Sequence, residues 1–318
     1  MKKSLYFGAL ILLLAGQWGC GLKLSPSSPV AAASAPTPTL ATTTYVNQWL
    51  GAGSGRLSDP EGIAVDANNN IYVTDVSLDE VIKYDDNGNV LARWGNTGNV
   101  TLDQPIGIAV ENGNIYVADA SNARVVEYNP AGDVIALVSP QGAAGGLFIY
   151  PTGISFDAAG NMYVCDNSDE VYQFNTSLQL TNQWGAAGAS RGLFNYPVDA
   201  AEDNSGNIFV ADNNSDNVVK FNLQTDTYST WGTYGTQAGQ FDGPSDVKLD
   251  SKGNVYVVDT DNNRVEVFNS NGTFLSQFGQ GSNAAQNLNG PNSIALDSNG
   301  NAYVADSGNS RVVKYSLN

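Results

Sequence analysis

The chain has 318 residues, a length that allows one to three domains. Lys and Arg number 14 against 31 Asp and Glu, so the formal net charge is −17; such a surface repels phosphate, and we expect no nucleic-acid partner. The chain contains no histidine, which excludes mechanisms that need imidazole as a base, a proton shuttle or a metal ligand.

Residues 1–19 have the pattern of an export signal. Two lysines precede an apolar stretch, Leu5 to Gly16, that is too short to span a bilayer, and Cys20 follows it. The segment resembles a bacterial lipoprotein signal, in which the cysteine becomes the lipid-bearing first residue of the mature chain. We therefore expect an exported protein of the bacterial cell envelope, anchored by lipid at Cys20 to the outer membrane or cell surface. The alternative is an ordinary secretory leader that is cleaved elsewhere, with a secreted product.

Residues 20–44 are predicted to be a tether. Ser, Pro, Ala and Thr dominate, and no charged residue occurs from Ser25 to Thr44, so the segment cannot bury enough apolar surface to fold. Its proline content favours an extended spacer between the membrane and the folded part. Lipidation of Cys20 would leave Cys165 as the other cysteine, so no intrachain disulfide is expected.

From residue 45 onward the sequence is repetitive. The pattern Asn, apolar, aromatic, Val, any residue, Asp occurs six times, and successive copies begin 44 to 47 residues apart. This spacing is typical of propellers and other repeat arrays. The copies are residues 70–75, 114–119, 161–166, 207–212, 254–259 and 301–306.

Each repeat unit predicts four short antiparallel strands, the composition of one propeller blade. In the second unit the strands are residues 105–110, 115–118, 124–128 and 134–138, separated by turn-forming residues. The last unit has three strands, and residues 45–51 supply the missing fourth-strand pattern. Pairing this N-terminal outer strand with the last blade closes a ring of six blades and hides both open sheet edges.

Three sequence blocks recur within the units: Pro-x-Gly-Ile-Ala-Val-Asp, then Gly-Asn-Ile-Tyr-Val-Ala-Asp, then Asn-x-Arg-Val. Together they resemble the NHL repeat over roughly residues 45–318. The resemblance implies an all-β fold, a six-bladed β-propeller of four-stranded antiparallel blades. It does not imply one activity, because folds of this kind carry different sites on their loops.

In such a blade strand one begins and strand two ends on the same face, which we call the mouth face. The repeat aspartates stand at the end of strand two, one per blade. A ring of carboxylates resembles a metal site, but equal positions of different blades lie far apart, and Asp at a strand end commonly accepts hydrogen bonds from turn N–H groups. We expect a structural role for Asp75, Asp119, Asp166, Asp212, Asp259 and Asp306.

In three units an arginine stands five residues after the repeat aspartate, where it suits a local ion pair; these are Arg124, Arg264 and Arg311. The other units have Glu80, Glu170 or Asn217 at this position. Either these acidic units form a solvated rim, or they attract cations or a basic partner. The acidic rim predicted in this way consists of Asp79, Glu80, Asp169, Glu170 and Asp216.

A second departure lies at the predicted channel mouth. The position two residues after the proline of strand one is glycine in three units but Asp199, Asp246 or Ser293 in the others, and Glu61 and Asn292 precede this position by one residue in the first and last units. Oxygen ligands without His or Cys suit Ca²⁺ or Mg²⁺. These side chains either hold a cation such as Ca²⁺ or a polar ligand, or they are an ordinary polar lining.

Tyr150 and Tyr196 precede the first strands of neighbouring blades. They predict a shared aromatic groove for a sugar or peptide, unless they pack between the blades.

The leading functional hypothesis is a non-catalytic binding or sensing module that presents its mouth face to a protein, peptide or glycan and acts as a monomer, with no required cofactor. Streptogramin lyases and amidating lyases of similar fold rely on His, which this chain lacks. A Ca²⁺-dependent hydrolase or lactonase of the gluconolactonase-like type is the first alternative, and a structural component of the envelope is the second.

Overall fold

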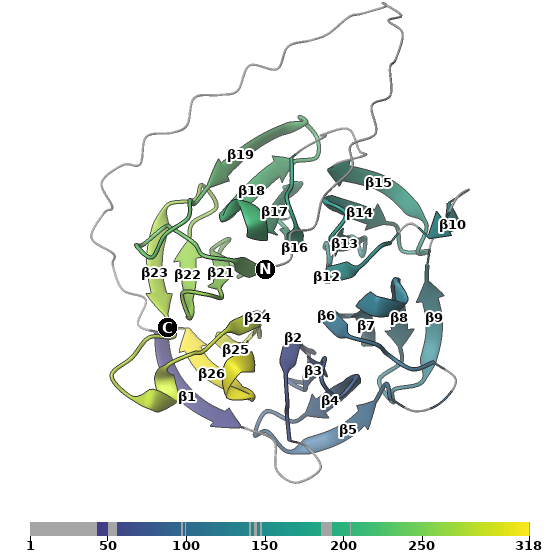
Figure 1. Ribbon diagram of the computed structural model, residues 1–318, viewed down its shortest axis with the longest axis horizontal. Helices are drawn as coiled ribbons and strands as arrows, with labels where there is room; N and C mark the ends of the chain where they lie inside the picture. The colour runs from purple at the N-terminus through teal and green to yellow at the C-terminus, as the bar shows by residue number, and fades with distance from the viewer. Residues whose placement is uncertain are drawn as a thin grey trace, which may run out of the picture. The chain divides into compact units, whose positions relative to one another are not determined.

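A computed structural model describes residues 43–49, 56–96, 98, 100–139, 141–142, 145–146, 148–185, 193–203 and 205–317. In this part of the chain, six four-stranded antiparallel sheets stand side by side in a ring (Figure 1). The predicted all-β propeller is therefore confirmed. The leader, Cys20, residues 20–42 of the tether and residues 50–51 of the closing strand lie outside the described residues.

In blades 1 to 5 the strands follow the chain order from the innermost to the outermost, and in blade 6 the N-terminal strand β1 is the outermost. Blade 1 comprises β2 (Pro60–Val65), β3 (Ile71–Asp75), β4 (Glu80–Tyr84) and β5 (Val90–Trp94). Blade 2 comprises β6 (Pro105–Glu111), β7 (Asn114–Asp119), β8 (Arg124–Tyr128) and β9 (Val134–Val138). Blade 3 comprises β12 (Pro151–Phe156), β13 (Met162–Asp166), β14 (Glu170–Phe174) and β15 (Leu180–Gly185).

Blade 4 comprises β16 (Pro197–Glu202), β17 (Asn207–Asp212), β18 (Asn217–Asn222) and β19 (Thr227–Trp231). Blade 5 comprises β20 (Pro244–Leu249), β21 (Val255–Asp259), β22 (Arg264–Phe268) and β23 (Phe274–Phe278). Blade 6 comprises β24 (Pro291–Leu296), β25 (Asn301–Asp306), β26 (Arg311–Leu317) and β1 (Thr43–Trp49). A short hairpin of β10 (Gln141–Gly142) and β11 (Gly145–Gly146) follows blade 2, and short 3-10 turns are η2 (Ala120–Asn122), η3 (Asn213–Ser215), η4 (Ala284–Gln286) and η5 (Ser307–Asn309).

The ring is closed by β1, as the sequence predicts. This strand begins at Thr43, two residues earlier than expected, and pairs antiparallel with β26 from Thr43 opposite Leu317 to Trp49 opposite Val312. Because the first and last segments of the propeller share one sheet, both of the edges that an open ring would expose are paired. None of the helical segments among the described residues is long and apolar enough to cross a membrane.

The hairpins between strands one and two have a local cause. Asp66 accepts hydrogen bonds from the backbone N–H groups of Asn68 and Asn70, at 2.8 and 2.9 Å, and its other oxygen accepts one from the Asn70 amide at 2.7 Å. This Asx turn places a residue or glycine with positive φ at the tip of the hairpin, so the turn forms from residues adjacent in sequence. The same arrangement recurs at Asp157, Asp203, Asp250 and Asp297.

The core lies between the blades and contains aromatic residues of the outermost strands. The ring of Trp94 on β5 lies 6.2 Å from that of Tyr72 in its own blade and 5.9 Å from that of Tyr128 in blade 2. Trp184 and Trp231 occupy equivalent places between blades 3 and 4 and between blades 4 and 5. Burial of these large rings fixes each blade against the next.

Candidate ligand-binding site at the mouth face

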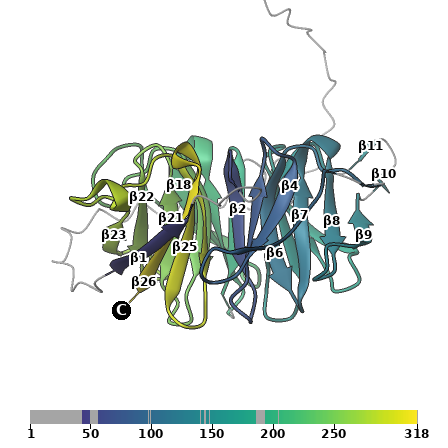
Figure 2. The same ribbon diagram turned by 90° about the horizontal axis from the view of Figure 1, so that it is seen from below.

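The strands of each blade run between two faces of the ring, as the side view in Figure 2 shows. The six repeat aspartates are buried at the mouth-face end of strand two. Each accepts backbone N–H groups of the connection that enters strand one; Asp166, for example, accepts those of Ile149 and Tyr150 at 3.0 Å. Equivalent bonds reach Asp75, Asp119, Asp212, Asp259 and Asp306. These contacts are those expected of a framework role.

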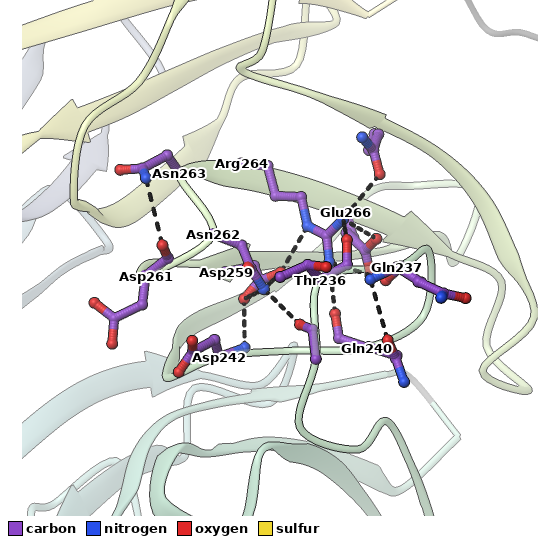
Figure 3. A network of polar contacts seen from close by, with 12 residues as sticks. Thr236, Gln237, Gln240, Asp242, Asp259, Asp261, Asn262, Asn263, Arg264 and Glu266 are labelled. Atoms are coloured by element: carbon purple, nitrogen blue, oxygen red, sulfur yellow. Dashed lines mark hydrogen bonds and ion pairs between the residues drawn. The ribbon is translucent and has the colours of Figure 1, made fainter.

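The arginines that follow these aspartates hold the preceding connection as well. In Figure 3, Arg264 donates to Asp259 at 2.7 Å and to the carbonyl oxygens of Thr236, Gln237 and Gln240 at 2.9, 3.0 and 2.7 Å. Glu266 lies buried beside the guanidinium, and burial raises its pKa to about 8 in spite of that positive charge. The network therefore anchors the whole connection from β19 to β20.

Glu80 and Glu170, which replace the arginine, are buried and do not belong to an exposed rim. Glu80 accepts from the Arg93 guanidinium, with 2.7 Å to Nε, and Glu170 accepts from the Gln183 amide at 2.7 Å. Both carboxylates thus bond to strand four of their own blade. The third substitution, Asn217, leaves its buried side-chain oxygen without a hydrogen-bond partner.

The other three residues of the predicted rim connect neighbouring blades. Asp79, Asp169 and Asp216 each precede strand three, have positive φ, and accept the backbone N–H of the residue before the next blade's strand-one proline. The acceptor distances are 2.9 Å to Gln104, 2.8 Å to Tyr196 and 3.0 Å to Gly243, and Asn263 bonds in the same way to Gly290 at 2.7 Å. We call these four side chains the inter-blade braces.

The braces coincide with an unusual backbone at the residues that they hold. Gln104, Tyr196, Gly243 and Gly290 all have φ between 53° and 65°, a region that costs a residue with a side chain about 1–2 kcal/mol. At the other two junctions Ala123 and Ser310 take the place of the brace, and the residues before the next strand-one proline, Tyr150 and Asp59, are not among those with positive φ. Of the four braced junctions, two therefore have glutamine or tyrosine in a conformation for which the other two have glycine.

Glycine in strand one of the first three blades has a steric reason. A Cβ atom on Gly62 would clash with the Ile106 carbonyl oxygen, and one on Gly107 with that of Thr152, because strands one of neighbouring blades approach closely at the centre of the ring. At the same position of strand one, blades 4 to 6 have Asp199, Asp246 and Ser293 in place of glycine.

The structure brings Asp199 and Asp246 together around a lysine. Lys248 Nζ lies 2.5 Å from Asp199 Oδ2 and 2.6 Å from Asp246 Oδ1. Asp246 also accepts the Ser293 hydroxyl at 2.5 Å and the Ile294 N–H at 2.7 Å. The chain itself therefore supplies the positive charge that the sequence pattern assigned to a bound cation. Lys248 was not foreseen, although it lies two residues after Asp246 and so on the same side of β20.

Protonation of this group follows its contacts. Burial opposes the charge on Lys248, but the two carboxylates outweigh it and raise the lysine pKa. Burial likewise opposes ionisation of Asp246, yet Lys248 and the Ser293 hydrogen bond lower its pKa. Burial dominates at Asp199, whose pKa is raised. Of the two carboxylates, Asp246 is therefore the one that ionises more readily.

A cavity of about 460 Å³ opens on the mouth face. Val198 and Ser245, which line it, come one residue before Asp199 and Asp246 in their strands. Its inner ring is the residue after the strand-one proline, contributed once by every blade: Glu61, Ile106, Thr152, Val198, Ser245 and Asn292. Around it lie Val76, Gln104, Tyr150, Tyr196, Asn213, Gly243, Thr260 and Asp261. Its volume is in the range of small-molecule sites.

Four of the predicted site residues, Glu61, Asn292, Tyr150 and Tyr196, line this one cavity, whereas Asp199, Asp246 and Ser293 do not. Burial and the neighbouring Asp59 raise the pKa of Glu61 to about 7, against the opposing hydrogen bond from Asn292. Burial also raises the pKa of both tyrosines. Within the described residues no group of three or more Cys, Asp or Glu is arranged to hold a metal ion.

Gln104 and Asp261 are cavity residues that the sequence did not indicate. Gln104 Oε1 accepts from Tyr150 Oη at 2.9 Å and from Ser121 Oγ at 2.8 Å. Asp261 lies just after a repeat aspartate in the loop before strand three. Their sequence signal was weak because each differs from the equivalent residue of every other blade, which a comparison of repeats treats as variable surface.

The comparisons with known proteins agree with this architecture. The family model described as the NHL repeat matches residues 57–77, 102–128, 241–268 and 288–315. No curated protein matches the sequence. Among solved structures, a streptogramin B lyase is 14% identical, with a TM-score of 0.60, and the alignment covers 86% of this chain and 98% of the lyase.

Two further structures are similar. A structural genomics protein of unknown function from Bacteroides thetaiotaomicron has a TM-score of 0.64 at 17% identity, with 87% of this chain and 73% of that protein covered. A catalytically inactive virginiamycin B lyase from Staphylococcus aureus, solved with quinupristin, has a TM-score of 0.58 at 11% identity, with 87% and 99% covered. At these identities the likeness shows the fold. The chain therefore carries NHL repeats in a six-bladed β-propeller.

Proposed function

We propose that this propeller is a ligand-binding module, without catalytic activity of its own, that holds a small polar ligand in the mouth cavity. The observation that carries the proposal is that all six blades contribute a residue to the inner ring of one cavity of about 460 Å³. Hydroxyl, amide and carboxylate groups share this ring with Ile106 and Val198, and two phenols lie around it, the mixture found in small-molecule sites.

The contacts of Lys248 are evidence against the calcium-dependent hydrolase. Because the Lys248 ammonium group already bonds to both Asp199 and Asp246, a residue of the chain itself occupies the place of a bound cation between them. The sequence also has no histidine to serve as a base or a metal ligand. The fold relatives named as lyases share too little sequence to transfer their activity.

A screen by ligand-observed NMR tests the proposal. The library consists of small amines, neutral sugars, organic acids and blocked dipeptides. The matched variants are Ile106→Trp, which fills the cavity, and Leu91→Trp, which adds the same side chain at an exposed position of β5. We expect saturation transfer to compounds of at least one class with the parent and Leu91→Trp, and its loss with Ile106→Trp. Equal binding to both tryptophan variants, or no binding by any class, would refute the proposal.

We further propose that the module is exported and tethered through Cys20. The support is the leader sequence and the spacer of residues 20–44, which has no charged residue from Ser25 to Thr44. In cells that express the full chain, metabolic labelling with an alkyne fatty acid should modify the parent and spare Cys20→Ala, while Cys165→Ala, the control at the buried cysteine, stays labelled. Labelling that survives Cys20→Ala would contradict the tether.

A further inference from the structure

Among the described residues, the lining of the mouth cavity includes acidic side chains and no basic ones. Glu61 and Asp261 both line it, and no Lys or Arg of the described part of the chain does. The ion pairs found among the described residues include neither carboxylate. Figure 3 shows the Asp261 carboxylate pointing away from the Arg264 network, although the two residues are close in sequence.

The environment of Glu61 differs from that of Glu80 and Glu266, which face arginines. It is closer to that of Glu127, which accepts from the neutral Tyr116 and Asn114 at 2.7 and 2.8 Å, and of Glu170, which accepts from the Gln183 amide, but Glu61 also lines an open cavity. The side-chain partner of Glu61 is the neutral amide of Asn292, and the charges nearest to it, Asp59 and Asp75, are also negative. Among the residues that the structure describes, an ionised Glu61 therefore has no basic side chain as a countercharge.

The surroundings of Glu61 suit a positive group with an organic body. Tyr150 and Tyr196 line the cavity and are close enough to Glu61 for its charge to raise the pKa of both phenols. Aromatic ring faces attract ammonium and guanidinium groups. The formal net charge of −17 draws cations toward the molecule from a distance.

We infer that the ligand of the mouth cavity is an organic cation, in which an ammonium or guanidinium group pairs with Glu61 and an attached ring or chain lies against Tyr150 and Tyr196. This inference rests on the proposed function and names the ligand class. The cation is either a free amine or the lysine or arginine side chain of a peptide.

Binding of such a cation depends on pH in a defined direction. The pKa of Glu61 is about 7, raised by burial and by Asp59 and Asp75, while Asn292 on β24 opposes the shift. Asp261, Tyr150 and Tyr196 are the other titratable groups of the cavity, and the tyrosine pKa values lie above the neutral range. An alkylammonium group stays protonated between pH 6 and 8. Affinity should therefore rise about tenfold from pH 6 to pH 8 as Glu61 ionises.

The experiment uses three compounds that share a 4-ethylphenol body and carry an ammonium group, no added group or a carboxylate: tyramine, 4-ethylphenol and 3-(4-hydroxyphenyl)propanoate, titrated by calorimetry or NMR at pH 6, 7 and 8. A blocked tyrosyl-lysine dipeptide is the peptide arm. We expect tyramine or the dipeptide to bind, with the stated pH dependence, and the anion not to bind. Preference for one of the two cations identifies its source. Ca²⁺ at equal concentration should not displace the cation from the tyrosine contacts.

The matched variants are Glu61→Gln and Glu202→Gln. Glu202 also has a pKa of about 7, but it ends β16 at the hairpin opposite the mouth, so its substitution removes one charge without touching the cavity. Glu61→Gln should weaken binding and abolish its pH dependence, and Glu202→Gln should leave both unchanged. If 4-ethylphenol or the anion binds as well as tyramine, or if neither cation binds while other compounds enter the cavity, the inference fails and the proposed function stands. If compounds of every charge fail to bind, both fall.

Discussion

At the residue scale, blade 4 shows what the arginine of the repeat does by lacking it. Asp212 is buried like its counterparts, but the residue paired with it on strand three is Asn217, where blades 2, 5 and 6 have Arg124, Arg264 and Arg311. Burial raises the pKa of Asp212 to about 6, and no arginine opposes that shift as Arg264 does at Asp259. The folded state thus holds a proton on Asp212 at pH values where the unfolded chain, with an ordinary aspartate pKa, has lost it.

Restoring the arginine should stabilise the protein. In the parent, the Asp212 contribution to the free energy of unfolding falls as the pH rises from about 4 through 6, because the unfolded state binds fewer protons in that window. Asn217→Arg supplies the missing charge and should raise the free energy of unfolding at pH 7 by about 1 kcal/mol. Denaturant titrations at pH 4.5 and 7 measure the change. The control is Ser229→Arg, which adds the same charge at an exposed position of the same blade.

Equal stabilisation by Ser229→Arg would mean that the effect comes from reduced net charge rather than from the Asp212 pair. No gain at pH 7 from Asn217→Arg would mean that Asp212 is satisfied by its backbone bond to Asn195.

Residues differ in how far the sequence predicts them. The framework role of the repeat aspartates could be inferred because their partners are backbone N–H groups that every blade provides in the same place. The environment of Asp199 could not, because its partner Lys248 comes from the next blade, 49 positions away. From sequence alone, a carboxylate at a variable position that binds a cation cannot be distinguished from one that pairs with a lysine of the same chain.

At the scale of elements, the inter-blade braces connect the framework to the cavity. Asp79 and Asp169 hold Gln104 and Tyr196, whose side chains line the cavity, in the left-handed conformation. Asp216 makes the same bond to Gly243, which has no side chain to position and adopts positive φ freely. Similar bonds therefore have different expected consequences for binding.

Loss of the Asp169 brace should weaken ligand binding. Asp169→Ala removes the acceptor of the Tyr196 N–H, and the strained backbone of Tyr196 can then relax and carry its ring away from the cavity. We expect about fivefold weaker binding of whichever compound the NMR screen identifies, as for the loss of one hydrogen bond. Asp169→Asn keeps the acceptor, as Asn263 does naturally, and should restore affinity. Asp216→Ala should leave affinity unchanged; equal losses from both alanine variants would assign the braces to stability alone.

Elements were the most predictable level of this structure. The hairpins could be read from the sequence because their Asx turns join residues four positions apart, as from Asp66 to Asn70. The aspartates before strand three are visible in the sequence, but their role is not. The N–H groups that they accept lie 25 to 27 positions away in the next blade. The sequence pattern suggests an acidic rim, whereas the structure shows that Asp79, Asp169 and Asp216 join neighbouring blades.

At the scale of the whole molecule, closure of the ring depends on β1. Trp49 is buried, its ring lies 6.2 Å from that of Tyr303, and it belongs to the cluster between blades 6 and 1. Lys314 and Tyr303 of blade 6 add contacts at 2.5 and 2.6 Å to Asp86 of blade 1. This junction is the one that chain connectivity does not enforce.

Weakening the closing strand should therefore destabilise the entire propeller. Trp49→Ala removes the aromatic wedge and should lower the free energy of unfolding by about 3 kcal/mol. Val46→Ala, on the same strand at a half-exposed position, should cost less than about 1 kcal/mol. Thermal and denaturant unfolding followed by tryptophan fluorescence and circular dichroism measure both. A loss for Trp49→Ala no larger than that for Val46→Ala would contradict closure by β1.

The central claim is that the mouth cavity is where this propeller binds its ligand, and tyrosine NMR tests it most directly. The protein is labelled with ¹³C on its tyrosine rings, the signals of Tyr150 and Tyr196 are assigned with phenylalanine variants, and a compound found in the screen is added. Tyr228 and Tyr234, which are exposed and do not line the cavity, serve as internal controls. We predict saturable shifts at Tyr150 and Tyr196 with the control signals unmoved. Shifts at Tyr228 or Tyr234 while the two cavity tyrosines stay still would place the ligand elsewhere and contradict the claim.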